Sequence, residues 1–167
     1  EFDEATGTLT ISGEGAMDSY EGYSNWEEYT ELFDTVEYSG KLENYGEYAF
    51  YNCKNLKEFE IAPVIGAHAF EGCSNISGVK VPKGFVLNEI GDYAFYGCDN
   101  LGMLIIGNPE CVIADSPYVC PEDMVIYGVA GSTAQAYAEK YNREFKEFRE
   151  PGFGEQEVVA EGTCGEN

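Results

Sequence analysis

The sequence predicts an α/β solenoid of the leucine-rich repeat type, with about four to five coils between an N-terminal β-hairpin cap and a C-terminal helical cap. Three near copies of one segment carry this prediction: YGEYAFYNCKNL from Tyr45, IGAHAFEGCSNI from Ile65 and IGDYAFYGCDNL from Ile90. The copies begin 20 and 25 residues apart, an interval typical of stacked structural repeats. Each copy is followed by a run that fits L-x-x-L-x-L, the strand of a leucine-rich repeat.

The three strand runs begin at Leu56, Ile76 and Leu101, and a run over residues 33–39 precedes them. Because side chains alternate along a strand, one set faces the core and the other set faces the opposite side. The predicted core set is Leu56, Phe59, Ile61, Ile76, Val79, Val81, Leu101, Leu104 and Ile106. The other set, which we expect to line the concave face, is Thr35, Glu37, Glu58, Glu60, Gly78, Lys80, Met103 and Ile105, and all of these except Gly78 are the expected ligand-binding residues.

Three of the six cysteines, Cys53, Cys73 and Cys98, occupy the same position in the three copies. In stacked coils their Cβ atoms would lie about 4.8 Å apart, which is wider than the ~3.8 Å that a disulfide prefers. We therefore expect buried, unpaired thiols that pack as small hydrophobic groups. Cys111 and Cys120 remain possible disulfide partners. With no C-x-x-C pair and one histidine, the sequence argues against a structural zinc site.

The sequence divides into four regions. Residues 1–32 are predicted to form the N-terminal cap, in which TLTIS follows a short run and a turn as in a β-hairpin. The coils are expected over 33–128, where VIADSPYVCPEDMVIYG is a weaker copy with Ser-Pro in place of Tyr-Ala. Residues 129–149 are predicted to form the helical cap with Ser132 as its N-cap, and 150–167 an acidic linker or tail. The helical residues expected to face the last coil are Ala134, Ala136, Tyr137, Ala138 and Tyr141.

The segment over residues 17–33 concentrates aromatic side chains. Tyr20, Tyr23 and Trp26 are interleaved with Glu, Ser and Asn, so they could form an aromatic patch for a carbohydrate or a protein. The alternative is a helical cap packed on the first coil, because four apolar side chains recur at helical spacing. These four residues are Trp26, Tyr29, Leu32 and Phe33.

The chain has 31 acidic and 9 basic residues, which gives a formal net charge of −22. Nucleic-acid binding depends on Lys and Arg that neutralise phosphates, so we expect no nucleic-acid partner, and an anionic membrane surface is equally unsuited. No apolar run approaches the roughly 20 residues of a transmembrane helix, so we expect no membrane insertion in this segment. The chain begins with Glu, without a start Met or a signal peptide, and we interpret it as an excised or mature segment.

The sequence predicts no enzyme, no cofactor and no metal site. His68, the one histidine, takes the variable repeat position that Tyr48 and Tyr93 hold in the other copies, so we interpret it as a rim residue. A Ser-His-Asp or Cys-His arrangement therefore lacks its base. No carboxylate pair is singled out by its setting, and no acidic run has the D-x-D-x-D-G spacing of a calcium loop.

Several motifs together resemble the BspA-like leucine-rich repeat family of bacterial surface proteins. They are the A-F-x-x-C-x-N-L runs, the lead-ins IGDYAF and IGAHAF, the head GTLTISGEGAM and the end IYGVAGSTAQAYAEKYNREF, which together span Phe2 to Phe148. The resemblance implies a secreted or wall-attached bacterial protein whose coils act in adhesion or bind host or neighbouring-cell molecules. It supplies no catalytic residues. The chain departs from the family pattern at Tyr45, in the 25-residue interval and in the Ser-Pro copy.

We therefore expect a noncatalytic module, extracellular and at the bacterial cell surface, that binds a protein of a host or neighbouring cell through its concave sheet. The alternatives are a structural spacer in a tandem surface array and a glycan-binding module that uses the Trp26 region. The end EGTCGEN and the head EFDEATGTLTISG resemble two halves of one continuous family motif. The chain is thus interpreted as one unit of an array joined through its tail, or as a module with an unpartnered tail.

Overall fold

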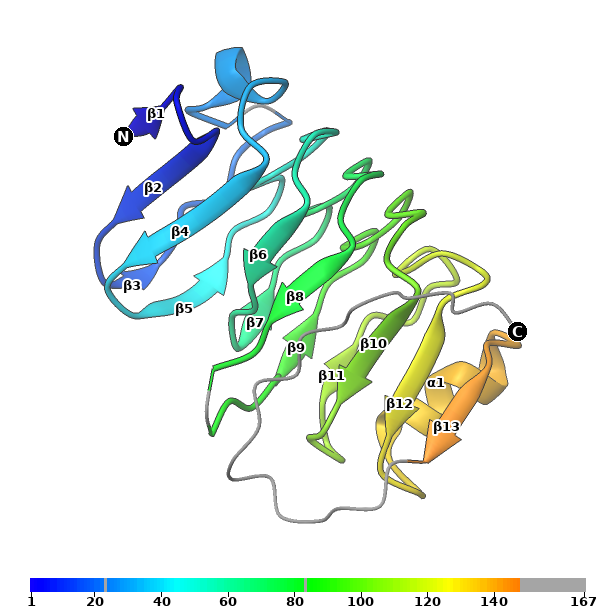
Figure 1. Cartoon of the computed structure of the whole chain (residues 1–167). Helices are drawn as coiled ribbons and strands as arrows, with labels where there is room; N and C mark the ends of the chain where they lie inside the picture. The colour runs from blue at the N-terminus through cyan, green and yellow to red at the C-terminus, as the bar shows by residue number, and fades with distance from the viewer. Residues whose placement is uncertain (23, 83, 148–167) are drawn as a thin grey trace, which may run out of the picture.

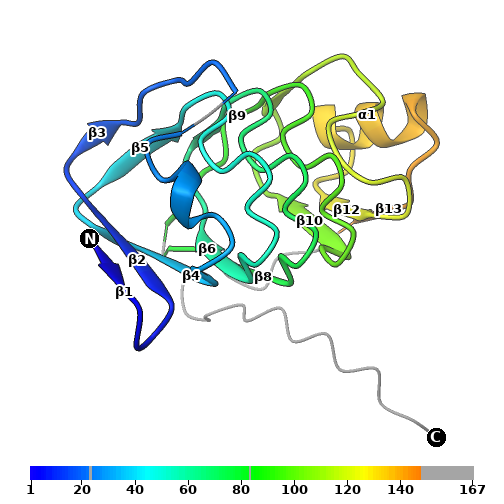
Figure 2. The ribbon, with the colours of Figure 1, turned by 90° about the horizontal axis from the view of Figure 1, so that it is seen from above.

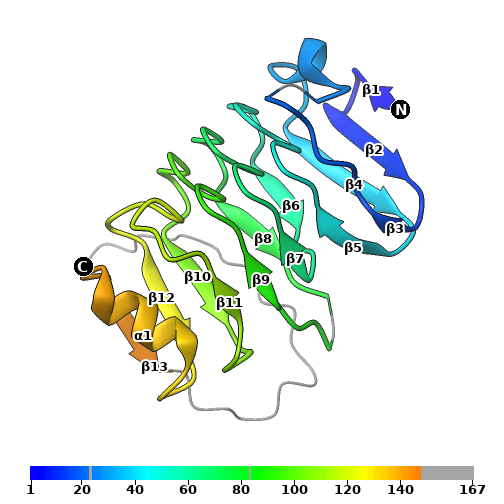
Figure 3. The ribbon, with the colours of Figure 1, turned by 180° about the vertical axis from the view of Figure 1, so that it is seen from behind.

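In the computed structural model, which describes residues 1–22, 24–82 and 84–147, the chain winds as a solenoid with two layers of strands (Figure 1). The front strands are β1 (Phe2–Asp3), β2 (Thr8–Ser12), β4 (Thr35–Ser39), β6 (Glu58–Glu60), β8 (Gly78–Lys80), β10 (Met103–Ile106), β12 (Val125–Gly128) and β13 (Phe145–Glu147). The rear strands, seen from behind in Figure 3, are β3 (Gly15–Ala16), β5 (Leu42–Tyr45), β7 (Val64–Ile65), β9 (Glu89–Ile90) and β11 (Val112–Ile113). The helical elements are the 3₁₀ turn η1 (Glu27–Tyr29) and the helix α1 (Thr133–Lys140).

The strands of successive coils pair in parallel, because each coil repeats the path of the one before it. The rear layer is one five-stranded sheet in the order β11-β9-β7-β5-β3. The front layer consists of two sheets, β1-β2-β4-β6-β8 and β10-β12-β13, and the described strands β8 and β10 do not pair. This break falls in the 25-residue interval, whose additional residues lie between β8 and β9. The rear sheet and the turns therefore connect the two halves of the solenoid.

The prediction that Val81 faces the core is wrong, because its side chain is 36% exposed. Val79, two residues earlier, is half-buried. After β8 the chain departs from the path of the other coils, and Leu87, which is 2% exposed, enters the core before β9. The other predicted core residues of the strand runs are buried.

The predicted N-terminal hairpin is confirmed, since β1 pairs with β2 in antiparallel register with Phe2 opposite Leu9. The strand β2 also pairs in parallel with β4, beginning with Thr8 opposite Thr35. In the rear layer β3 pairs with β5 in the same way. The strands β2 and β3 thus form a coil of their own, which brings the solenoid to five two-strand coils, β2/β3 to β10/β11.

The aromatic segment forms a much shorter helix than the spacing predicted, because among its described residues only those of η1 are helical. Trp26 stacks on Phe50 of the following coil with ring centroids 5.2 Å apart. Phe33 is fully buried, whereas Leu32 is 56% and Tyr29 is 41% exposed. The apolar residues at helical spacing therefore do not lie on one helix. Trp26 covers the first coils, whereas Phe33 lies in the segment that leads into β4.

The predicted C-terminal helix is confirmed as α1, which lies at the opposite end of the coils from η1 (Figure 2). The Oγ atom of Ser132 accepts a hydrogen bond of 3.3 Å from a backbone amide of the first turn, as expected for an N-cap. Ala134, Tyr137 and Ala138 are buried, whereas Ala136 is exposed on the outer side of the helix. After the helix, β13 adds in parallel to β12, a strand that the sequence did not predict.

A row of stacked rings fills the space between the two layers. Phe50, Phe70 and Phe95, which we call the core row, lie with ring centroids 5.5 and 5.7 Å apart and interplanar angles of 10° and 5°. All three are fully buried. Tyr45 is also fully buried, at the position where the other copies have Ile. Its hydroxyl donates a hydrogen bond of 2.5 Å to the carbonyl of Glu60, so the departure from the pattern is accommodated inside the core.

The repeat cysteines are buried free thiols, as predicted, and they also donate hydrogen bonds. Sγ of Cys73 lies 2.9 Å from the carbonyl oxygen of Phe50, and Sγ of Cys98 lies 3.1 Å from that of Phe70. These two thiols are therefore second donors to carbonyls of an earlier coil, which also accept from the amides of Cys53 and Cys73, a role that the sequence pattern did not reveal.

Cys111 and Cys120 are buried and unpaired, so they do not form the disulfide that the sequence left open. Cys164 and the acidic tail over residues 150–167 lie outside the described residues. The joining of units through that tail therefore stays a prediction.

Candidate functional site

The predicted ligand-binding residues lie on the outer side of the front layer, and we call them the front strip. They are Thr35 and Glu37 of β4, Glu58 and Glu60 of β6, Lys80 of β8, and Met103 and Ile105 of β10. The residues between them, Val36, Phe59 and Leu104, point inward and are buried. Thr35 and Ile105 are half-buried, and the remaining members of the strip are exposed. The structure thus brings these side chains to one face, while their role in binding stays a prediction.

The acidic part of the front strip is centred on β6. Glu58 lies opposite Thr35 on one side and Gly78 on the other, and Glu60 lies opposite Lys80. Nζ of Lys80 is 3.5 Å from Oε2 of Glu58, and Glu60 forms no ion pair with a described residue. Because a single lysine faces several carboxylates, this part of the strip keeps a negative charge.

The front strip extends at both ends beyond the residues predicted from the sequence. Thr8 and Thr10 of β2 lie beside the β4 residues, and Val125 and Tyr127 of β12 lie beside the β10 residues. The first pair was missed because β2 was assigned to a cap, and the second because the register of the last copy was open. The sheet break between β8 and β10 divides the strip into an acidic patch and a largely apolar patch.

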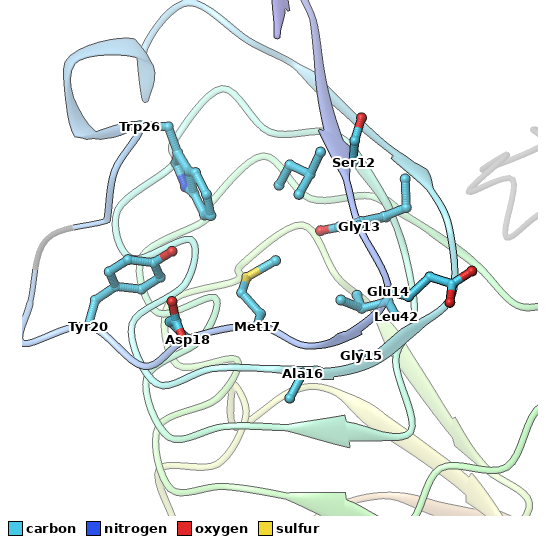
Figure 4. A pocket seen from close by; sticks show the side chains of 12 residues that line it. Ser12, Gly13, Glu14, Gly15, Ala16, Met17, Asp18, Tyr20, Trp26 and Leu42 are labelled. Carbon is cyan, nitrogen blue, oxygen red and sulfur yellow. The ribbon is translucent and has the colours of Figure 1, made fainter.

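A pocket of about 280 Å³ opens at the N-terminal end of the solenoid (Figure 4). The turn from β2 to β3, the segment that follows β3, and the strands β4 and β5 form its walls. Figure 4 shows Tyr20, Asp18 and Met17 near Trp26 at one end of the pocket. The hydroxyl of Tyr38, also in the lining, is buried without a hydrogen-bond partner among the described residues, and burial raises its pKa well above the usual value.

Trp26 is already engaged in contacts that hold the fold together. Its Nε1 atom donates a hydrogen bond of 2.8 Å to the carbonyl of Ala49, and its ring stacks on the core row. Tyr20 packs edge-on against the same ring at 5.6 Å. Tyr23, the third member of the predicted aromatic patch, lies outside the described residues. These contacts favour a cover over the first coils rather than an aromatic patch open to a sugar.

A second row of stacked rings follows the turns between the rear and front layers, and we call it the turn ladder. It consists of Tyr48, His68, Tyr93 and Tyr118, with successive centroid distances of 4.5, 4.9 and 5.1 Å and interplanar angles of 4°, 9° and 15°. In the last copy Tyr118, and not Ser116 of the Ser-Pro pair, continues the row. Interpreted from the sequence as a rim residue, His68 is half-buried inside the ladder, and its Nδ1 contacts Oε2 of Glu71.

Neighbouring coils are in register at these turns, which explains the stacking. The amide of Tyr48 donates to the carbonyl of Ala67 at 3.1 Å, and the amide of His68 donates to that of Asp92 at 2.8 Å. Because the backbones repeat at the spacing of adjacent strands, rings at equivalent positions meet face to face. The sequence did carry a signal for this row, because an aromatic ring recurs two positions before the Phe of each copy. We had interpreted that position as variable.

Metal ligation and thiol reactivity are two chemical properties that the described residues allow us to assess. Among them, no group of three or more His, Cys, Asp or Glu side chains is placed to hold a metal ion. Burial raises the pKa of the Cys73 and Cys98 thiols, and raises that of Cys111 to about 12. These thiols are therefore protonated at neutral pH, which makes them poor nucleophiles.

Comparison with known proteins identifies one family. The model of a family described as "BspA type Leucine rich repeat region" matches residues 27–117 in 6 copies, which is more than half of the chain. No curated protein and no solved structure matches the chain. Within the described part of the chain, no helix is both long and apolar enough to cross a bilayer.

Proposed function

Because the chain belongs to the BspA-type leucine-rich repeat family, we propose that it is a noncatalytic module that binds an extracellular protein through the front strip. The family is associated with bacterial cell-surface proteins and with protein–protein interaction. The surface location of this chain, and adhesion to a host or neighbouring cell as its purpose, are parts of the proposal. The partner is expected to be an extended protein region with a basic end.

The observation that carries this proposal is the alternation along the front strands. Val36 and Phe59 fill the core, while Glu37, Glu58 and Glu60 stand on one exposed face of paired strands. Side chains held on a rigid sheet present a fixed charge pattern, which favours a partner of complementary charge. In the other half of the strip, Met103 is 39% exposed, so the partner can make an apolar contact there in addition to the charged contacts at β4 and β6.

The test compares two double charge reversals on opposite sheets. The first is Glu58→Lys with Glu60→Lys in β6, and the matched control is Glu43→Lys with Glu89→Lys, at exposed positions of the rear strands β5 and β9. Binding to a panel of extracellular-matrix and host-surface proteins would be measured at low and high salt. We expect the front reversal to weaken the bound partner by about tenfold, added salt to weaken it further, and the rear reversal to have little effect.

Two results would contradict the proposal. Equal losses from the front and rear reversals would mean that the overall negative charge, and not the strip, attracts the partner. No binding across the panel by protein with the circular dichroism of a folded chain would favour the spacer interpretation instead.

A further inference from the structure

Two rows of side chains accompany the turn ladder on the same turns. One position before the ladder residues lie Glu47, Ala67 and Asp92, and three positions after them lie Tyr51, Glu71 and Tyr96. The amide of Asn52 donates to the carbonyl of Glu71 at 2.7 Å, and the amide of Gly72 donates to that of Tyr96 at 2.8 Å. The coils are thus in register here, and Glu71 occupies the coil between Tyr51 and Tyr96.

Tyr96 lies beside the turn ladder, and its side chain is partly exposed to solvent. It is perpendicular to its neighbours, at 71° to Tyr93 with a centroid distance of 5.4 Å and at 86° to Tyr118 with 5.7 Å. Both faces of Tyr93 are already covered, by His68 and by Tyr118. Tyr93 can therefore contact Tyr96 only through its own ring edge. With an exposure of 44%, Tyr96 keeps ring surface that a partner can reach.

The electrostatic setting of this ring is negative. The turns over residues 46–52, 66–72 and 91–97 contain carboxylates but no Lys or Arg. Partial desolvation, together with the nearby charges of Asp92 and Glu71, raises the pKa of the Tyr93 hydroxyl. At the C-terminal end of the ladder, by contrast, Asp115 is paired with Lys140. The uncompensated charge therefore lies over the earlier coils, beside Tyr96.

Glu71 is held in place and still has an oxygen to offer. Its Oε2 atom contacts Nδ1 of His68, whose ring is fixed between Tyr48 and Tyr93. The other oxygen, Oε1, makes no hydrogen bond with a described residue. A carboxylate of fixed orientation next to an exposed aromatic ring is a suitable combination for a planar cation.

We propose that Glu71 and the exposed ring of Tyr96 bind an arginine side chain presented by a basic, extended segment of a partner protein. A guanidinium stacks on an aromatic face and donates in-plane hydrogen bonds to a carboxylate at the same time, whereas a lysine ammonium is more strongly hydrated and cannot stack. The site lies on the turns and not on the front strip. It therefore adds a second recognition surface to the one proposed above and stands independently of it.

The experiment uses two labelled peptides that differ only in their cation. One alternates Arg with Gly and the other alternates Lys with Gly, and binding to the purified chain is followed by fluorescence anisotropy at physiological salt. Since 31 acidic residues attract any basic peptide, the informative quantity is the ratio of the two affinities. We expect the Arg peptide to bind about two- to fivefold more tightly, because a guanidinium can stack on the ring and donate to the carboxylate at the same time.

Variants then test whether the preference for the Arg peptide arises at Glu71 and Tyr96. Tyr96→Ala should abolish the preference for Arg, Tyr96→Phe should keep it because the ring face is retained, and Glu71→Gln should reduce it because the charge is lost. As a matched control, Tyr29→Ala removes a ring of similar exposure elsewhere, at 41%, and should leave the ratio unchanged. The front reversal Glu58→Lys with Glu60→Lys should weaken both peptides without changing their ratio, which separates this inference from the proposed function.

Equal affinities of the two peptides for the unmodified chain would overturn the proposal. A preference for Arg that survives Tyr96→Ala and Glu71→Gln would overturn it as well, because it would then arise elsewhere. Binding of a neutral oligosaccharide that Tyr96→Ala abolishes, without any difference between the peptides, would identify the site as one for a sugar and would also reject the arginine assignment.

Discussion

Two rows of stacked rings run through the same coils, and they share a stacking geometry but differ in burial. The core row and the turn ladder are two residues apart in each copy, as in His68 and Phe70. Their centroid distances are similar, at 5.5 and 5.7 Å inside and 4.5 to 5.1 Å outside. The core row is fully buried, whereas His68 and Tyr93 are half-buried and Tyr118 is 46% exposed.

Coil register and burial determine different properties of the two rows. Register alone produces stacking, because equivalent residues of neighbouring coils lie one above the other. Burial decides the consequence: the inner rings contribute to the free energy of folding, and the outer rings form a rigid surface. The outer row even has unfavourable backbone geometry, since Tyr48, His68 and Tyr93 have φ angles of 58°, 58° and 55°, in the left-handed region.

The largest expected contrast compares one residue of each row within a single coil. Phe70 contacts the rings of Phe50, Phe95, Phe59 and Tyr45, so Phe70→Ala leaves a cavity and should lower the free energy of unfolding by about 3–5 kcal/mol. His68→Asn removes an outer ring but places a residue that tolerates positive φ, so it should cost about 1 kcal/mol or less. Urea unfolding of both variants measures the difference. Similar losses for the two would contradict the division into a stabilising row and a surface row.

A second prediction concerns how closely the coils approach beneath both rows. A Cβ atom at Gly91 would lie 2.4 Å from the backbone nitrogen of Ala67 and 2.7 Å from the carbonyl carbon of Gly66. Because both contacts are backbone atoms, Gly91→Ala must separate the coils, and we expect a loss of about 2–3 kcal/mol in the free energy of unfolding. The control is Gly102→Ala, where a Cβ meets nothing within 4 Å. Thermal unfolding in which the two variants behave alike would disprove this account of the repeat glycine.

The thiol that joins the core row to the next coil gives a smaller effect. Cys73→Ala removes one of the two hydrogen bonds to the carbonyl of Phe50, which keeps the one from the amide of Cys53, whereas Cys73→Ser retains a hydroxyl that can donate to the same carbonyl. We therefore expect the Ala variant to be less stable than the Ser variant by about 1 kcal/mol. At Cys111, whose nearest acceptor is 3.9 Å away, the same two changes should not show this order. Equal stabilities at Cys73 would mean that the thiol serves only as a small hydrophobic group.

The sequence predicted the inner row better than the outer row for a physical reason. Phe50, Phe70 and Phe95 are identical in the three copies because only one kind of side chain fills the same buried space in each coil. At the outer position Tyr48, His68 and Tyr93 differ in polarity, so the position looked variable and was assigned to the rim. The shared property was a flat ring, which becomes informative once the coils are known to be in register.

The front strip shows the same limit. A period of two correctly placed Glu58 and Glu60 on the outer face of β6. The same period of two wrongly placed Val81 in the core, because the additional residues that follow β8 lead the chain away from the coil path. An alternating pattern of residues does not reveal such a departure. The 25-residue interval was visible in the sequence, but the break in the front sheet is a property of strand pairing.

The smallest effect tests how the C-terminal end of the turn ladder is fixed. The pKa of Asp115 is lowered from its ordinary value of 3.8, mainly by the hydrogen bond from Lys140 and then by that from Tyr141. A carboxyl whose pKa is lower in the folded chain than in the unfolded chain adds stability above the unfolded value, and this stability is lost as the pH falls through the folded value. Asp115→Asn should therefore be slightly less stable than the unmodified chain near neutral pH and equally stable well below pH 3.8. Because the carboxyl is exposed, the difference in stability should also diminish with added salt. Chemical denaturation at both pH values measures it, and a difference that persists at low pH would show that Asp115 acts through packing and not through its charge.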